Sequence, residues 1–170
     1  MLGNFERELI MKTIANYSVS MEILKRYERR AKKHYGQNFI IDPSVVRNIA
    51  NHSGEGDFVL EIGPGLGALT QQLAHNYKHV VAYEIAEHMG EILSETLEGY
   101  DNIEIIHEDF LKADLSKYTQ PLTVCANLPY YITTPILFKL MEYDIAKMTL
   151  MVQKETSDRL TAKPNTNDYA

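Results

Sequence analysis

Short apolar segments alternate with helical patterns from residue 42 to residue 152, and this alternation constrains the fold more than any other feature. Such alternation predicts a parallel sheet with helices on both faces, joined by right-handed crossovers. The expected fold class is therefore α/β. The predicted strands are 58–60, 79–84, 103–106, 122–126 and 148–152. The predicted helices are 20–31, with Ser20 as cap, 42–53, 68–76, 87–98 and 135–142.

A polar residue stands at the end of each of the first four predicted strands. These residues are Glu61, Glu84, Asp109 and Asn127. In open α/β sheets, ligands bind at the carboxyl edge of the strands, near the point where the strand order reverses. Polar strand ends also serve solubility and helix capping. The four together, with glycines beside the first, favour a binding site at this edge.

The glycine-rich loop from Glu61 to Gly67 follows the first predicted strand. Glycines let the backbone turn sharply and approach a ligand closely. Gly63, Gly65 and Ala68 match the dinucleotide pattern GxGxxG/A, which alone is weak evidence for a nucleotide. A tight turn without a ligand is the simpler alternative.

The acidic residues around this loop favour S-adenosylmethionine over NAD as the ligand. Glu84 follows Gly65 by 19 residues and can accept hydrogen bonds from both ribose hydroxyls. Asp109 can accept a hydrogen bond from the exocyclic amine of an adenine. A diphosphate prefers positive surroundings, whereas a ligand with a sulfonium and an ammonium group tolerates acids.

The segment Asn127-Leu128-Pro129-Tyr130 is similar to the motif of methyltransferases that act on exocyclic amines of bases. The Asn127 side-chain oxygen and a backbone carbonyl of the turn can hold the two amine protons, so catalysis is mostly orientation and electrostatics. Pro129 stiffens the turn, and Tyr130 offers an aromatic face for stacking. The target base must be unpaired or flipped out to reach such a pocket. An isolated segment of this kind is otherwise a turn with an aromatic plug.

Charge is unevenly distributed along the chain. The formal net charge is −6, but residues 25–33 carry six cations against one acid. A basic segment on an acidic body can bind phosphates, and it is also typical of a solvated helix face. We expect RNA contacts from Arg29, Arg30, Lys32 and Lys33.

Several classes of protein are disfavoured by composition. The chain has no long apolar run for a membrane span, no leader-like apolar segment at its start, and no histidine spacing that favours a metal site. Its single cysteine, Cys125, fits a reducing compartment, and we expect a cytoplasmic protein. Translation could start at Met1 or Met11. We expect a basic helical arm over 1–34 and the catalytic domain over 35–170.

Taken together, these motifs resemble the KsgA family of small-subunit rRNA adenine N6,N6-dimethyltransferases. The resemblance extends from about residue 14 to residue 169. Glu84 and five segments carry it: Gly36 to Asp42, Glu61 to Gly67, His107 to Asp109, Asn127 to Pro135, and Met151 to Glu155.

The resemblance implies a Rossmann-like class I methyltransferase that uses S-adenosylmethionine. The implied substrate is two adjacent adenosines in the 3′-terminal hairpin of small-subunit rRNA, in an immature 30S particle. The implied cofactor-binding residues are Asn38, Ile40, Gly63, Gly65, Glu84, Asp109 and Asn127. The implied catalytic residues, which hold the base, are Asn127, Pro129 and Tyr130.

Two other functions stay open at this point. A resistance-type 23S rRNA adenine methyltransferase usually has Ile where this chain has Leu128. A non-catalytic RNA-binding assembly factor also fits, because the chain stops at Ala170, before the last two of the usual seven strands and the helical C-terminal domain that the resemblance implies. We therefore expect a truncated chain with five of the seven strands.

Overall fold

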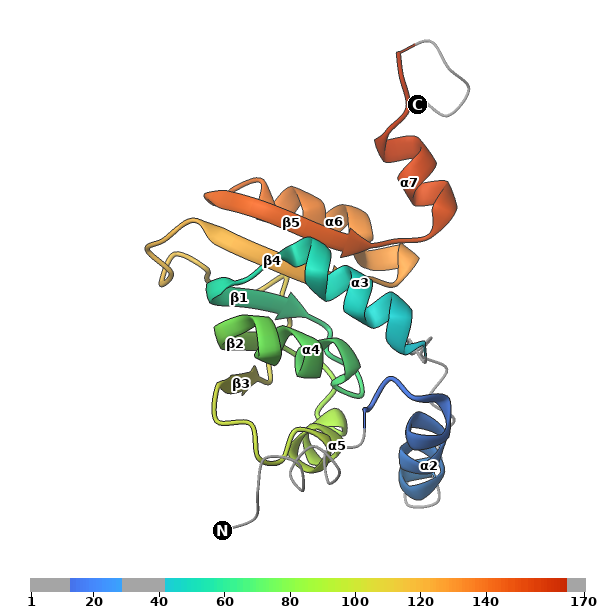
Figure 1. The fold of residues 1–170 in the computed structure, drawn as a ribbon. Helices are drawn as coiled ribbons and strands as arrows, with labels where there is room; N and C mark the ends of the chain where they lie inside the picture. The colour runs from blue at the N-terminus through green and yellow to red at the C-terminus, as the bar shows by residue number, and fades with distance from the viewer. Residues whose placement is uncertain (1–12, 29–41, 165–170) are drawn as a thin grey trace.

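The computed structural model describes residues 13–28 and 42–164, in which five parallel strands form one sheet (Figure 1). The strand order is β3-β2-β1-β4-β5. The chain builds outward from β1 to β3 and then returns to the other side of β1. The order therefore reverses between β1 and β4. The strands are β1 (Gly56–Ile62), β2 (Tyr77–Tyr83), β3 (Ile103–Ile106), β4 (Leu122–Asn127) and β5 (Ile145–Met151).

Neighbouring residues of the central strands are buried on opposite faces of the sheet. On β1, Val59 belongs to one core cluster and Leu60 to the other, and Val80 and Val81 divide in the same way on β2. Side chains alternate across a strand, so a continuous apolar run supplies both faces of a covered sheet. The strand composition thus explains why helices pack on both sides.

Helices cover the two faces unequally. Helices α3 and α4 lie in front of the sheet in Figure 1, and α6 lies behind it. The first core cluster joins the sheet to α2, α3, α4 and α5, and the second joins it to α6 and the segment after β3. The helices are α2 (Tyr17–Glu28), α3 (Pro43–Ser53), α4 (Ala68–Asn76), α5 (Met89–Thr96), α6 (Tyr130–Leu140) and α7 (Lys154–Leu160).

Most predicted elements are present, with shifted boundaries. Helix α4 has the predicted bounds, and α3 begins one residue later than predicted, after its N-cap Asp42, whose carboxylate accepts from the Ser44 N–H at 2.8 Å. Ser20 is not a cap: it is fully buried inside α2. Glu61 does not end its strand either, because β1 continues through Ile62.

The largest difference from the predicted elements concerns α6. The sequence predicts Pro135 as the start of this helix, since proline is favoured at the first helical position. Pro135 instead lies inside α6, and Pro129 is the N-cap in an extended conformation, with φ −60° and ψ 145°. The helix therefore begins at Tyr130, the last residue of the segment proposed to hold a base. Helix α7 is absent from the predicted elements.

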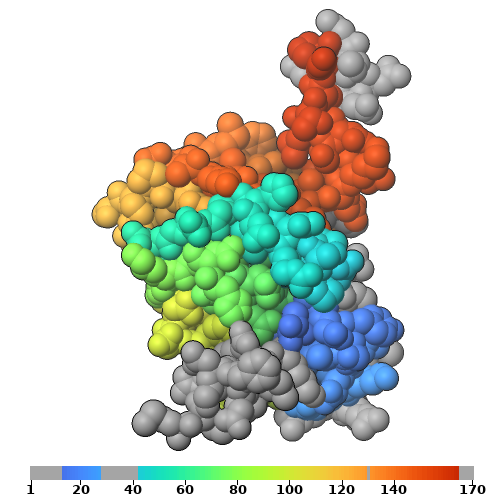
Figure 2. Space-filling model, viewed as in Figure 1, coloured from blue at the N-terminus to red at the C-terminus, as the bar shows by residue number. Residues whose placement is uncertain are grey.

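The β5 end of the sheet is less covered than its centre. Within the described residues, β5 pairs with β4 alone, and Met148 of β5 is 41% exposed. Helix α7 has no buried residue and projects from the body (Figure 2). None of the helices in the described ranges is long and apolar enough to cross a membrane.

Candidate active site

A cavity of about 520 Å³ opens at the carboxyl edge of the sheet, where the strand order reverses. Residues that follow β1, β2, β3, β4 and β5 all contribute to its lining, together with the first half of α6. The four polar residues predicted from strand ends, Glu61, Glu84, Asp109 and Asn127, all line this one cavity. The predicted convergence at this edge is confirmed.

Glu84 is oriented by the backbone around it. Its side chain is 4% exposed, and its two carboxylate oxygens accept hydrogen bonds from the Gly65 N–H at 3.3 Å and the Ala86 N–H at 2.9 Å. The bond from Gly65 connects the residue after β2 to the glycine loop after β1, and the bond from Ala86 is local. A carboxylate held by two backbone donors still has lone pairs left to accept from a ligand hydroxyl.

The glycine loop adopts a backbone that side chains rarely tolerate. Gly63, Gly65 and Gly67 have φ values of 70°, 57° and 86°. A Cβ at Gly63 would have no heavy atom within 4 Å, so this backbone borders open space within the cavity lining. A Cβ at Gly67 would lie 3.0 Å from the side chain of Leu97. Gly63 thus has room for a ligand, whereas Gly67 is needed for packing against Leu97, just after α5.

We expect Gly67→Ala to lower the free energy of unfolding by about 1–3 kcal/mol, because it combines a left-handed φ with a close contact. Gly63→Ala should cost less, since it meets no neighbouring atom. Gly56→Ala is the matched control: its Cβ would make ordinary contact with Tyr77 at 3.6 Å. Urea denaturation of the three variants checks this ranking. Equal losses at Gly56 and Gly67 would contradict it.

Asp109 lies three residues beyond β3 and begins a hydrogen-bonded turn. Its Oδ1 accepts from the Leu111 N–H at 3.0 Å, and its backbone oxygen accepts from the N–H groups of Lys112 and Ala113. Its Oδ2 lies 3.9 Å from the Lys112 Nζ. The turn thus holds this partly exposed carboxylate at the cavity wall.

Asn127 is the last residue of β4 and lines the cavity together with Leu128 and Pro129. The Leu128 N–H donates to the Met151 oxygen at 3.1 Å, which ties the segment to β5. The Pro129 carbonyl accepts from the Ile132 N–H and the Thr133 hydroxyl. The predicted stacking role of Tyr130 stays a prediction, because its side chain lies outside the described part of the chain.

Glu61 is the most unusual ionisable group of the site. It is 1% exposed, and its Oε2 has no hydrogen-bond partner among the described residues. Burial raises the pKa of Glu61 to about 8; the nearby Thr70 hydroxyl opposes this and the Glu84 carboxylate adds to it. A buried acid without a full set of partners suits a site that receives a cation.

The raised pKa of Glu61 predicts how stability depends on pH. Between pH 4.5 and about 8 the carboxyl ionises in the unfolded chain but stays protonated in the folded one. The contribution of protonated Glu61 to the free energy of unfolding is therefore fully present below pH 4.5. It is lost as the pH rises toward 8, by at most about 1.4 kcal/mol per pH unit. Glu61→Gln is neutral throughout, so the difference between the two proteins isolates the effect. The free energy of unfolding of both proteins is measured from pH 5 to pH 8. If it depends on pH in the same way in both, the raised pKa of Glu61 is contradicted.

Several predicted residues lie outside the described part of the chain, and their roles stay predictions. These are the cofactor residues Asn38 and Ile40 and the RNA residues Arg29, Arg30, Lys32 and Lys33. Of the basic segment, Lys25 and Arg26 are described. Arg26 pairs with Glu95 of α5 and with Glu22. The proposed boundary between residues 34 and 35 is likewise untested.

Apolar side chains complete the cavity, and the sequence patterns do not identify them. Ile85, directly after Glu84, is 65% exposed, and Tyr131 is 70% exposed, although both line the cavity. Phe110, next to Asp109, is buried in its wall. Adjacency to a polar strand end could have indicated Ile85 and Phe110, whereas Tyr131 lies four residues beyond Asn127. The described residues contain no cluster of histidine, cysteine or acidic side chains that could hold a metal ion.

Burial also separates Cys125 from the chemistry of the site. It is fully buried in β4, and this burial raises the pKa of its thiol to about 12. A thiolate is the nucleophilic form of cysteine. The side chain is therefore part of the core.

Comparison with protein families gives one match over most of the chain. Residues 28–170 match the model of the family described as Ribosomal RNA adenine dimethylase. The chain is 46% identical over 169 residues to Ribosomal RNA small subunit methyltransferase A of Enterococcus faecalis and 49% identical to that of Geobacillus thermodenitrificans. The matches cover 93% of this chain but 57% and 58% of those proteins. The chain thus spans little more than half the length of these relatives.

Two of the solved structures that resemble this chain do so at more than 30% sequence identity. The 23S rRNA methyltransferase ErmE superposes with a TM-score of 0.65 at 32% identity, over 78% of this chain and 52% of that one. A dimethyladenosine transferase from Plasmodium falciparum superposes with a TM-score of 0.63 at 31% identity, over 76% and 48%. These two similarities confirm the methyltransferase-type α/β fold.

Proposed function

The chain belongs to the ribosomal RNA adenine dimethylase family, and from this premise we propose that it carries the catalytic site of an rRNA adenine N6,N6-dimethyltransferase. The methyl donor is S-adenosylmethionine. The substrate is a pair of adjacent adenosines near the 3′ end of small-subunit rRNA, in an immature subunit in the cytoplasm. The relatives that share 46–49% of its residues carry small-subunit names.

The observation that carries this proposal is the convergence of Glu61, Glu84, Asp109 and Asn127 on one cavity. We assign the ribose hydroxyls to Glu84, because its carboxylate is already fixed by two backbone donors. We assign the adenine amine of the cofactor to the turn at Asp109. We assign to Gly63 and Gly65 the stretch of backbone that comes closest to the cofactor. The exposed Ile85 offers an apolar face beside the ribose site.

Glu61 suits the cationic end of the cofactor. A buried carboxyl with one oxygen unpartnered among the described residues gains a partner when an ammonium group enters the cavity. The cation would then favour the ionised acid and lower its pKa. When bound, S-adenosylmethionine supplies an electrophilic methyl group, and the residues of this chain hold and orient the two reactants.

The target base is placed on the β4 side of the cavity. The Asn127 side-chain oxygen is one acceptor for the amine protons of adenine. The second is the Leu128 carbonyl, because the Pro129 carbonyl already accepts from Ile132 and Thr133. Two acceptors favour a pyramidal nitrogen whose lone pair is directed at the methyl group, and a preorganised site of this kind stabilises the transition state.

The two alternatives differ in substrate or in turnover. The fold similarity to ErmE is as high as that to the dimethyladenosine transferase, so fold alone does not distinguish 23S from small-subunit rRNA. Leu128 and the small-subunit relatives favour the latter. An assembly factor without turnover would bind the cofactor or RNA but transfer no methyl group.

One methylation assay separates these functions. A version extended to the length of its relatives is incubated with labelled S-adenosylmethionine and either immature small subunits or 23S rRNA. We expect N6,N6-dimethyladenosine in the small-subunit rRNA alone. Label in 23S rRNA would support the resistance-type enzyme, and cofactor binding without label in either RNA would support the assembly factor.

The basic segment gives a prediction that does not involve the cofactor. Replacing Arg29, Arg30, Lys32 and Lys33 with glutamine should weaken RNA binding and reduce its salt dependence, by up to about 0.7–0.9 in slope for each phosphate that is no longer neutralised. The affinity for the cofactor should not change. Binding to the rRNA hairpin, measured at several salt concentrations, checks this. A salt slope equal to that of the unmodified protein would indicate a solvated helix face.

A further inference from the structure

Lys139 joins α6 to the segment after β3. It lies in the last turn of α6, the helix that follows the Asn127-Leu128-Pro129 segment. Its half-buried ammonium group donates to the Ala113 oxygen at 2.6 Å and the Leu111 oxygen at 3.2 Å. Both acceptors belong to the segment after β3, more than 25 residues earlier in the chain.

The two carbonyls that accept from Lys139 belong to the turn that holds Asp109. The Asp109 carboxylate accepts from the Leu111 N–H, and the Asp109 backbone oxygen accepts from the Ala113 N–H at 3.1 Å. The same two residues therefore bond to Asp109 through their N–H groups and to Lys139 through their oxygens. Leu111 and Ala113 thus link Asp109 to α6.

Two aromatic rings lie near the same ammonium group. The Nζ lies 5.8 Å from the centroid of the Phe110 ring and 5.7 Å from that of Tyr143. Phe110 packs edge-on against Tyr83, with centroids 5.5 Å apart, and both rings line the cavity. A cation near aromatic rings is stabilised most where water is excluded.

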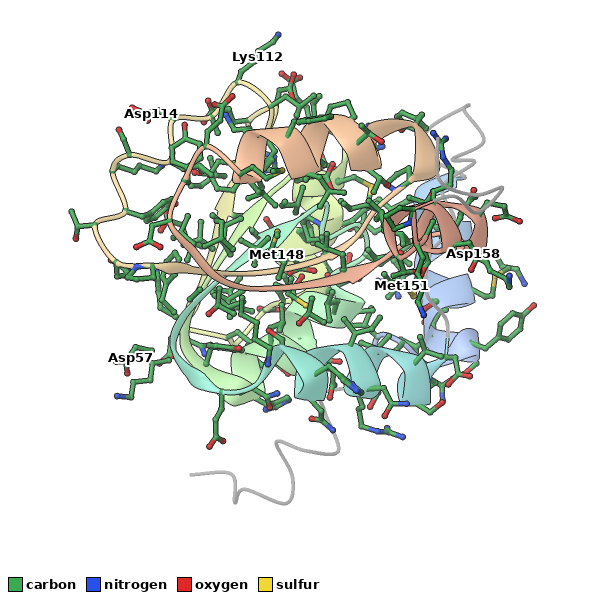
Figure 3. The ribbon with its side chains drawn as sticks, turned by 90° about the horizontal axis from the view of Figure 1, so that it is seen from above. Asp57, Lys112, Asp114, Met148, Met151 and Asp158 are labelled. Atoms are coloured by element: carbon green, nitrogen blue, oxygen red, sulfur yellow. The ribbon has the colours of Figure 1, made fainter. Side chains whose placement is uncertain are left out.

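We propose that Lys139 is a positioning residue that couples the adenine side of the cofactor pocket to the helix of the base-binding segment. This inference rests on the proposed function, because the ligands of Asp109 and Asn127 come from it. Lys139 fixes the turn that holds the cofactor adenine relative to the segment that holds the target base. The charged residues Lys112 and Asp114 of the same turn do not fit this positioning role. Their side chains lie at the outer surface (Figure 3), and Lys112 is 81% exposed.

The test compares Lys139→Met, which keeps an apolar stem but has no donor, with Lys139→Arg, which keeps the charge and the donors. Lys78→Met is the control for loss of a cation, because Lys78 is 82% exposed and forms its ion pair with the equally exposed Asp57, at the start of β1. Cofactor affinity is measured by calorimetry with S-adenosylhomocysteine. Amide hydrogen exchange is measured in the free protein, where it reports on the turn without any ligand.

We expect Lys139→Met to weaken cofactor binding by about tenfold or more and to accelerate exchange at the amides of Leu111, Lys112 and Ala113. Exchange in β1 and β2 should stay as in the unmodified protein, and Lys139→Arg should restore most of both properties. Unchanged affinity and exchange in Lys139→Met would overturn the proposal. Faster exchange throughout the sheet, not restored by arginine, would also overturn it and indicate a purely structural residue.

The outcome for the unmodified chain keeps the two proposals distinguishable. If that chain and Lys78→Met bind the cofactor while Lys139→Met binds equally well, the proposed function stands and the positioning role of Lys139 fails. If the unmodified chain binds no cofactor, the proposed function fails. Exchange at residues 111–113 then decides the role of Lys139 in the turn.

Discussion

Asn127→Ala, in a version extended to the length of its relatives, is expected to lower the rate of methyl transfer by about 10²–10³-fold. Asn127 ends β4 at the cavity and is proposed to hold one proton of the adenine amine. Without it, the base keeps a single acceptor, and its lone pair is less well oriented toward the methyl group. Single-turnover transfer of labelled methyl to small-subunit rRNA measures the effect.

Cofactor affinity provides the necessary contrast for Asn127→Ala. Since the side chain is assigned mainly to the base, binding of S-adenosylmethionine should change little. Asn48→Ala, an exposed position on α3, is the matched control and should leave both properties unchanged. A folded Asn127→Ala protein that no longer binds the cofactor would show that Asn127 belongs mainly to the cofactor site. An unchanged transfer rate would remove it from the catalytic residues.

Glu84→Ala is expected to weaken binding of the cofactor by about 1.5–3 kcal/mol, roughly 10- to 150-fold. The variant loses the two acceptors for the ribose hydroxyls. It also frees the Gly65 and Ala86 N–H groups that the carboxylate now holds, so the glycine loop loses a support. Both effects weaken binding of the same ligand, and calorimetry with this chain measures their sum.

A control variant and a conservative variant accompany Glu84→Ala. Glu87→Ala removes an exposed acid three residues away and should leave affinity unchanged. Glu84→Gln keeps the shape and one acceptor oxygen, so we expect an intermediate loss. Unchanged affinity in a folded Glu84→Ala protein would reject the assignment of the ribose to this residue.

The amino-acid sequence is sufficient to predict the parts of the site that depend on strand ends. Glu84 and Asn127 stand where apolar runs stop, and in a parallel sheet all such ends meet at one edge. The strand order also matters, because β1 and β4 are neighbours although β2 and β3 lie between them in the chain. The pattern of apolar runs does not specify that order.

Other features depend on contacts between distant residues, and no local pattern contains them. Glu61 resembles a strand end in the sequence, but β1 continues past it between β2 and β4, and its side chain is buried. Pro135 resembles a helix start, whereas packing of Ile136 and Leu140 against the sheet stabilises α6 across the proline. The contacts of Lys139 join residues more than 25 positions apart, so no sequence pattern predicts them.

The structure of this chain with S-adenosylhomocysteine bound tests the central claim most directly. We predict the ligand in the cavity at the carboxyl edge of β1 and β4. Its ribose hydroxyls should lie within hydrogen-bond distance of the Glu84 carboxylate, its adenine amine should face the Asp109 turn, and its ammonium group should face Glu61. A ligand bound elsewhere, or bound here with its ribose away from Glu84, would contradict the proposed site.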